Sequence, residues 1–291
     1  MTPEERAAEP NAARVALITG GTDGIGRATA EALLRQGWRV CIVGRNHERC
    51  ARAVAELALS TGNSAVMSIT ADLSLLSDTR RASEEFAADH ERLDFLFLNA
   101  NAITQTRVLT TEGLESNLAL GFLSRVVMAE CLETLTAATP GAQILTVVGL
   151  NLSRLDFDDL TMAQKFSGQE ALGRWQWAMQ VWCREFNERQ STPMNVFMPG
   201  LVKTKILDTE PGRLQRTIIK AVMPFVAVSP EQSAQQVLAA LANASDTEAR
   251  DVYYPKGKPK GRRDLKELPG DGDRVWELAG VLTTEPPTAA S

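Results

Sequence analysis

A glycine-rich turn near the start of the chain has the spacing of a phosphate-binding element. It reads Thr19-Gly20-x-x-x-Gly24-x-Gly26 and follows an apolar run at 15–18 that is typical of a buried parallel strand. Glycines in a strand-to-helix turn let the backbone approach a ligand, and the helix start directs free N–H groups at a pyrophosphate. We therefore interpret the turn as part of a dinucleotide site, with a purely structural glycine turn as the alternative.

The end of the second expected strand bears on which dinucleotide would bind. The strand at 39–43 is followed by Gly44 and Arg45. Proteins that prefer NAD place an acid here for the ribose 2′-hydroxyl, and Gly44 offers none. Arg45 can instead pair with a 2′-phosphate through its guanidinium. This favours NADP(H), with a solvent-exposed Arg45 of no function as the alternative.

The turn at 19–26, together with Asn99-Ala100-Asn101-Ala102 after a later strand, resembles the short-chain dehydrogenase/reductase superfamily. The resemblance runs over about 14–254. It implies that Asp72 and Leu73 hold the adenine, with a helix cap by Asp72 as a compatible alternative, and that 199–204 reaches the nicotinamide. The cofactor-binding residues we expect are Thr19, Gly20, Thr22, Asp23, Gly24, Ile25, Gly26, Arg45, Asp72, Leu73, Asn99, Ala100, Pro199, Gly200, Val202 and Thr204.

The acid–base residues of that superfamily are absent from this chain. Its reaction uses a Tyr proton donor, a Lys four residues later, a Ser and an Asn. Segments 156–160 and 166–168 resemble the retinol-dehydrogenase-like branch, and this alignment places Leu172 at the Tyr, Gln176 at the Lys and Gly149 at the Ser. Asn117 fits the Asn position. The chain's two tyrosines, at 253 and 254, are too distant in sequence to restore the motif.

Loss of the tyrosine does not by itself exclude hydride transfer. A positioned acid contributes about 10²–10⁴ in rate, or roughly 3–5.5 kcal/mol, whereas positioning two reactants contributes about 7–11 kcal/mol. A ketone conjugated to a phenol or quinone can also delocalise its own negative charge. Asn117 and Gln176 are the candidate catalytic residues, with Asn151 and Ser153 as further substitute donors.

Apolar segments in the second half indicate the kind of substrate. The resemblance implies a variable substrate lid at about 205–225, and its apolar residues favour an apolar, polycyclic or lipidic ligand. The expected helix at 171–188 carries the stripe Trp175, Met179, Trp182 and Phe186, which indicates either core or subunit packing or an aromatic pocket. The resemblance leaves a homodimer through this helix open. The substrate-contacting residues we expect are Gly149, Asn151, Leu172, Trp175 and Leu207.

The elements that must position these residues alternate between strand and helix. Further strands are expected at 65–69, 93–98, 144–148, 194–198 and 252–254, with helices between them that include a long run at about 112–137. This order predicts an α/β fold with a doubly wound, Rossmann-type parallel sheet. We expect a flexible N-terminus at 1–13, a single domain at 14–282 and a disordered tail at 283–291.

Composition excludes several classes of function. The 291 residues carry a formal net charge of −5, and no apolar run reaches membrane-spanning length, so we expect neither nucleic acid nor a membrane as partner. The four cysteines are scattered and no metal-ligand cluster is visible, and the N-terminus is unlike a signal peptide, which favours the cytoplasm. A basic loop at 256–263 is expected to be a solvated surface turn.

These patterns predict an atypical NADPH-dependent ketoreductase acting on an apolar, aromatic polycyclic substrate. The departures from the superfamily motif look like those of reductases that tailor aromatic polyketide antibiotics. A catalytically silent relative is the alternative. It would use the nucleotide pocket for regulation, for partner binding or for a non-redox reaction.

Overall fold

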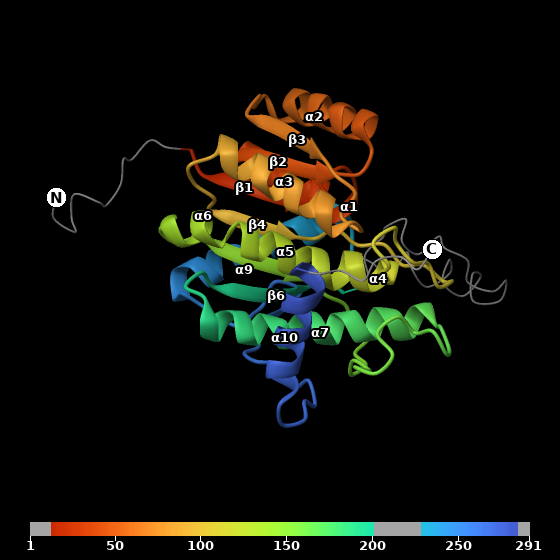
Figure 1. Cartoon of the computed structure of the whole chain (residues 1–291). Helices are drawn as coiled ribbons and strands as arrows, with labels where there is room; N and C mark the ends of the chain where they lie inside the picture. The colour runs from red at the N-terminus through yellow and green to blue at the C-terminus, as the bar shows by residue number, and fades with distance from the viewer. Residues whose placement is uncertain (1–12, 201–227, 285–291) are drawn as a thin grey trace.

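A computed structural model of the chain describes residues 13–200 and 228–284. In this part, seven parallel strands form one sheet in the order β3-β2-β1-β4-β5-β6-β7 (Figure 1). The predicted doubly wound fold is confirmed, and each predicted strand is present to within two residues. The strands are β1 (Val15–Thr19), β2 (Arg39–Gly44), β3 (Val66–Thr70), β4 (Phe95–Leu98), β5 (Gln143–Val147), β6 (Met194–Met198) and β7 (Tyr253–Pro255).

Helices cover both faces of the sheet, as alternating side chains along β1 require. Ala16 and Ile18 point into a core with three helices, α1 (Gly24–Arg35), α2 (His47–Thr61) and α9 (Pro230–Thr247). Val15 and Leu17 point into the opposite core. The helices on that second face are α3 (Leu76–Asp89), α4 (Ser116–Leu118), η1 (Ala119–Leu123), α5 (Ser124–Cys131), α6 (Glu133–Ala138), α7 (Gly168–Arg189) and α10 (Asp271–Thr284).

The long helix expected at 112–137 is broken into four pieces. It contains a π-helical turn, η1, between α4 and α5. A Cβ placed on Gly121 in this turn would lie 2.6 Å from the Cε2 atom of Trp175 on α7. The absence of a side chain at 121 therefore lets the indole pack directly on the turn. Such π-turns are frequent near functional sites, where they redirect side chains.

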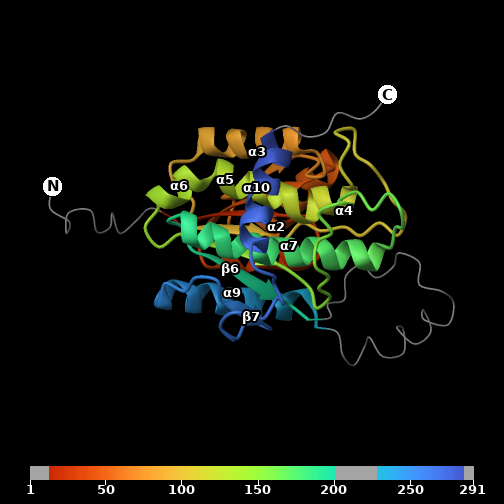
Figure 2. The same ribbon diagram turned by 60° about the horizontal axis from the view of Figure 1, so that its bottom comes forward.

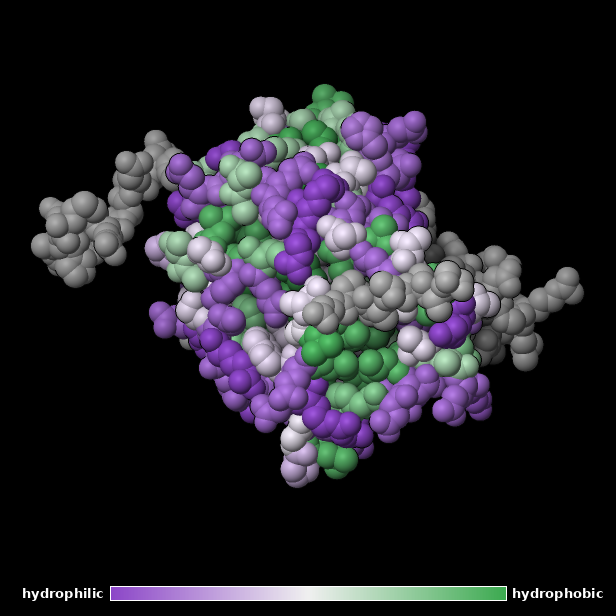
Figure 3. Space-filling model, viewed as in Figure 1, coloured by the Kyte–Doolittle hydropathy of each residue, from purple (hydrophilic) through white to green (hydrophobic). Residues whose placement is uncertain are grey.

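The C-terminal helix α10 crosses α7 on the outside of the second helical layer (Figure 2). Trp276 of α10 stacks on Trp182 of α7 with ring centroids 5.6 Å apart. Arg154 ties the start of α10 to the loop after β5 through a bidentate ion pair with Asp271. In the surface view of this side, hydrophilic residues predominate and one apolar patch lies in the lower centre, where α7 and α10 meet (Figure 3). The apolar stripe of α7 is itself buried, and a homodimer through this helix stays a prediction.

Several sequence-based expectations concern segments outside the described residues. They are the flexible N-terminus up to residue 12, the substrate lid at about 205–225, the tail from residue 285 and three site residues, Val202, Thr204 and Leu207. Within 13–200 and 228–284, no helix combines the length and the hydrophobicity that crossing a bilayer demands.

Candidate functional site

The ends of β1 and β4 meet where the strand order reverses. β1 pairs with β2 on one side and with β4 on the other, and ligands of such sheets bind at this switch point. The hydroxyl oxygen of Thr19, the last residue of β1, accepts hydrogen bonds from the N–H groups of Asn99 at 2.8 Å and Ala100 at 2.9 Å. Asn99 Nδ2 donates back to the Thr19 carbonyl oxygen at 3.0 Å. The two strand ends are thereby joined into one surface.

The glycines of the first turn allow backbone contacts that a side chain would prevent. A Cβ on Gly26 would overlap the Gly20 carbonyl oxygen and lie 2.7 Å from Asn99 Nδ2. Gly20 has a φ of 67°, which glycine adopts without strain. Asp23 accepts hydrogen bonds from the N–H groups of Gly24 and Arg27. The N–H groups of Ile25 and Gly26 have no acceptor among the described residues and remain as donors at the start of α1. This arrangement fits a pyrophosphate.

The end of β2 has no space for an acidic side chain. A Cβ on Gly44 would lie 2.7 Å from the Thr22 Cγ2 atom and 2.8 Å from Cys50 Sγ. The next residue, Arg45, is exposed. Its guanidinium is available to a ligand, because no hydrogen bond or ion pair to it occurs within the described residues. A guanidinium at this position suits a ribose 2′-phosphate, and the preference for NADP(H) stays a prediction.

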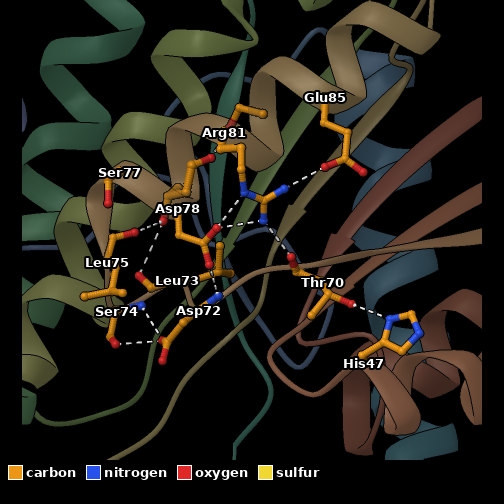
Figure 4. Close-up of polar contacts among 12 residues, drawn as sticks. His47, Thr70, Asp72, Leu73, Ser74, Leu75, Ser77, Asp78, Arg81 and Glu85 are labelled. Atoms are coloured by element: carbon orange, nitrogen blue, oxygen red, sulfur yellow. Dashed lines mark hydrogen bonds and ion pairs between the residues drawn. The ribbon is translucent and has the colours of Figure 1, made fainter.

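The segment after β3, where the sequence analysis expects the adenine, is held by a set of polar contacts (Figure 4). Asp72 Oδ1 accepts from the Ser74 N–H at 3.0 Å and from the Ser74 hydroxyl at 2.7 Å. Oδ2 of Asp72 accepts no hydrogen bond from the described residues. The start of α3 is capped instead by Glu112, which accepts from the N–H groups of Leu76 and Ser77. Asp72 therefore does not cap α3 and keeps one oxygen for an amino group such as that of adenine, beside buried Leu73.

Gln176 on α7 faces the end of β5. Its Oε1 accepts the N–H of Gly149 at 2.6 Å, and a Cβ on Gly149 would lie 2.9 Å from that oxygen. Because an N–H requires an acceptor, this bond fixes the orientation of the amide. The remaining Nε2 group is a donor only. Gln176 can therefore stabilise a negative oxygen, but it cannot serve as its acid.

Among the residues that the structure describes, no acid takes the place of the missing tyrosine. Leu172, at that position, is a half-buried apolar residue against the core. The two tyrosines of β7 are committed elsewhere, because the Tyr253 hydroxyl contacts Met198 Sδ at 2.9 Å and the Tyr254 hydroxyl donates to Asn243 Oδ1 at 3.0 Å. Burial also raises the pKa of both phenols. Neither hydroxyl is placed or tuned as a proton donor for this site.

The side chain of Asn117 is fully engaged in holding the loop after β4. Its Oδ1 accepts the Thr104 N–H, and its Nδ2 donates to Thr104 Oγ1 and to Glu115 Oε1, each at 2.8 Å. Both amide hydrogens are therefore used within the chain. The structure places Asn117 as a buried connector, and its role in proton transfer stays a prediction.

Comparisons with known proteins agree with this architecture. A family model for short chain dehydrogenases matches residues 14–151. A candidate daunorubicin C-13 ketoreductase, DnrU of Streptomyces sp. strain C5, is 34% identical over 66% of this chain and 67% of its own length. The chain belongs to the short-chain dehydrogenase/reductase family.

Other members of the short-chain dehydrogenase/reductase family align over more of the chain. Mouse retinol dehydrogenase 12 is 28% identical over 92% of this chain and 86% of its own length. Among solved structures, an alcohol dehydrogenase of Thermococcus sibiricus complexed with 5-hydroxy-NADP covers 87% of this chain and 99% of its own, with a TM-score of 0.65 at 20% identity. The chain spans between about half and two thirds of several curated relatives that it matches.

Within this short-chain dehydrogenase/reductase fold, two arginines near the site were missed by the sequence analysis. Arg125 on α5 is buried beneath the ends of β4 and β5. Arg263, in the loop expected to be a solvated turn, donates to the carbonyl oxygens of Gly149 at 3.3 Å and Leu150 at 3.0 Å. Isolated arginines carry no spacing signal, so only the fold reveals that both converge on the segment after β5.

The other site residues expected from the sequence differ in how deeply they are buried. Trp175 is 1% exposed and lies against η1, and the whole stripe of which it is part is buried in the core. Asn151 is exposed and donates to the Gln169 carbonyl oxygen at 2.6 Å. Pro199 and Gly200 follow β6 at the same edge of the sheet as Gly149. The structure therefore brings Gly149 and Gln176 together, leaves Leu172 one turn before Gln176 on α7, and buries Trp175 against η1.

Proposed function

We propose that the protein is an atypical NADPH-dependent ketoreductase for an apolar aromatic ketone. The observation that carries the proposal is the pairing of a glycine turn shaped for a nucleotide with a side-chain amide, that of Gln176, which Gly149 holds as a hydrogen-bond donor beside the end of β5. The relative DnrU bears the name of a ketoreductase of an aromatic polyketide, which supports this substrate class. Exposed Leu150, beside Gly149, adds apolar surface for such a substrate.

In this proposal the nucleotide is held along the edge of the sheet from β3 to β6. The N–H groups at the start of α1 bind the pyrophosphate, Arg45 binds the 2′-phosphate and Asp72 Oδ2 accepts from the adenine amino group. Asn99 and Ala100 contact the nicotinamide half, with Pro199 and Gly200 beside them. The Thermococcus alcohol dehydrogenase, which has the same fold, was solved with an NADP derivative.

NADPH, when bound, supplies the hydride. The carbonyl carbon of the substrate accepts this hydride, and the carbonyl π electrons move to the oxygen. Gln176 Nε2 donates a hydrogen bond to the developing oxyanion, a contribution worth about 2.7–4 kcal/mol for such a donor. The charge spreads further into the conjugated ring of the substrate. Water then supplies the proton, so no side chain of the site has to act as an acid.

A second candidate is a catalytically silent relative that binds the nucleotide without hydride transfer. The observation that favours it is that the Tyr253 and Tyr254 hydroxyls and the Asn117 amide are all engaged within the chain. In that case the nucleotide would serve regulation, partner binding or a non-redox reaction.

NADPH consumption separates the two candidates. Purified protein is incubated with NADPH and with two matched ketone sets, hydroxyaryl ketones such as 1-hydroxy-2-acetonaphthone and simple ketones such as cyclohexanone. We expect turnover only with the hydroxyaryl ketones, because only their conjugated rings can delocalise the negative charge that develops on the carbonyl oxygen. Fluorescence titration with NADPH is the control for an intact nucleotide site. Binding of NADPH without oxidation by any ketone would support the silent relative.

A further inference from the structure

Arg125 is a buried positive charge without a carboxylate partner in the described residues. It is 2% exposed. Nη1 donates to Thr146 Oγ1 at 2.8 Å and to the Val147 carbonyl oxygen at 2.5 Å, and Nη2 donates to the Ala100 carbonyl oxygen at 3.0 Å. Its guanidinium carbon lies 4.9 Å from the centre of the Trp175 ring. Nε is buried and has no hydrogen-bond partner.

This environment differs from that of another largely buried arginine, Arg184 on α7. Arg184 forms ion pairs with Asp251 and Glu267, so its charge is compensated locally. Removing a charge from water costs several kcal/mol per ion. The carbonyl oxygens and the aromatic face around Arg125 offset only part of this cost. Burial accordingly lowers the pKa of Arg125 to about 9, yet the guanidinium remains protonated at neutral pH. Its field therefore extends into the surroundings.

The surroundings in question are the strand ends that the proposed function assigns to the nicotinamide. Ala100 follows β4, and Val147 ends β5 two residues before Gly149. Gln176, which binds Gly149, stands where the resemblance places the family's lysine, so the site lacks the positive charge of that lysine. The guanidinium of Arg125 supplies a positive charge from below, with little water to screen it.

We propose that Arg125 is a specificity-determining residue that makes this site prefer the reduced nucleotide. The nicotinamide ring of NADP⁺ is a cation and that of NADPH is neutral. A fixed positive charge behind the ring therefore weakens NADP⁺ binding relative to NADPH binding. This inference rests on the proposed function for the location of the nicotinamide, and it assigns the direction of use, which is carbonyl reduction followed by release of NADP⁺.

The test is the ratio of the dissociation constants of NADP⁺ and NADPH, each measured by titration of the full chain near pH 7. We expect Arg125→Gln to lower this ratio about tenfold or more, because the amide keeps a hydrogen-bond donor and loses the charge. Arg125→Lys keeps the charge and is expected to retain most of the ratio. Arg174→Gln, which removes an arginine already paired with Glu170, is the matched control and leaves the ratio unchanged.

A role confined to packing would weaken both nucleotides equally and leave the ratio at its wild-type value in Arg125→Gln. That result would overturn the inference. If Arg125→Gln does not fold, the ratio measured in Arg125→Lys tests the inference by itself, because this variant loses the planar guanidinium but keeps the positive charge. A ratio that falls in Arg125→Lys would also overturn the inference. Failure of the proposed function is a separate observation, namely that bound NADPH reduces no ketone.

Discussion

The turn after β1 and the turn after β5 lie at the same edge of one sheet but are built in different ways. In the first, backbone atoms touch each other, and Gly26 has no room for a Cβ between the Gly20 carbonyl and Asn99. In the second, a side-chain amide, that of Gln176, bridges to the backbone of Gly149. The first turn therefore depends on the absence of side chains, and the second on the identity of one.

This difference explains how one half of the site can keep a family geometry while the other half changes its chemistry. A backbone cradle tolerates almost no substitution, because any new atom displaces main chain. A side-chain bridge can be rebuilt from other residue types, provided that the buried Gly149 N–H keeps an acceptor. The nucleotide and the acid–base functions of the fold are thus physically separable, and substitutions on each side should affect different measurements.

The largest effect is expected from Gly26→Ala. The new methyl group would overlap the Gly20 carbonyl oxygen and approach Asn99 Nδ2 to 2.7 Å, so the turn must open. Overpacking of this kind costs about 1–3 kcal/mol, and near the upper end of that range we expect NADPH affinity to fall about 100-fold in a fluorescence titration. Gly280→Ala is the matched control, because a Cβ on Gly280 in α10 meets nothing within 4 Å. If Gly26→Ala bound NADPH with wild-type affinity, the turn after β1 would not be part of the nucleotide site.

Gln176→Ala tests the turn after β5, and we expect it to affect catalysis and not nucleotide binding. We expect kcat for a hydroxyaryl ketone to fall about 100-fold, because the oxyanion loses its donor, while the dissociation constant of NADPH changes less than about threefold. Gln180→Ala, one helical turn later and also buried, is the control and should leave kcat nearly unchanged. If Gln176→Ala and Gln180→Ala lower kcat equally, the loss reflects general damage to α7, and Gln176 is not the donor to the oxyanion.

Arg45→Ala is expected to have a smaller effect, and one confined to the 2′-phosphate. A charge-assisted hydrogen bond is worth about 1.5–3 kcal/mol, so NADPH affinity should fall roughly 10- to 100-fold while NADH affinity stays the same. Arg52→Ala, which removes another exposed arginine from the neighbouring helix α2, should alter neither. If Arg45→Ala lowered the affinities for NADPH and NADH equally, Arg45 would not contact the 2′-phosphate.

The sheet and the first turn were predictable because their signals are local. Apolar runs set the strands, and the glycine spacing after Thr19 set the start of α1. The expected helix at 112–137 was wrong in its continuity. A π-helical turn interrupts it, and this turn packs against Trp175, which lies more than 50 residues later in sequence. The cap of α3 by Glu112 was missed for the same reason.

Site residues without a motif could not be found from the sequence. Arg125 is an ordinary residue of an apolar helix in the sequence, and only the packing shows that it is buried without a carboxylate in the described part of the chain. The orientation of the Gln176 amide likewise depends on Gly149, 27 residues earlier. The family motif gives the positions of Gly149 and Gln176 in the sequence but not the hydrogen bond between them.

The smallest effect is expected where Gly149 and Gln176 meet. In Gly149→Ala the new methyl group would lie 2.9 Å from Gln176 Oε1, so the amide must shift by a few tenths of an ångström. We expect kcat to fall about three- to tenfold with unchanged NADPH affinity. In the Gln176→Ala background the crowded atoms are gone, and Gly149→Ala should then cost nothing more. The resulting coupling, about 1 kcal/mol, is measured by a double-mutant cycle on kcat. Additive losses would instead mean that Gly149 affects the reaction independently of Gln176, and the side-chain bridge would then not be the feature that distinguishes the second turn from the first.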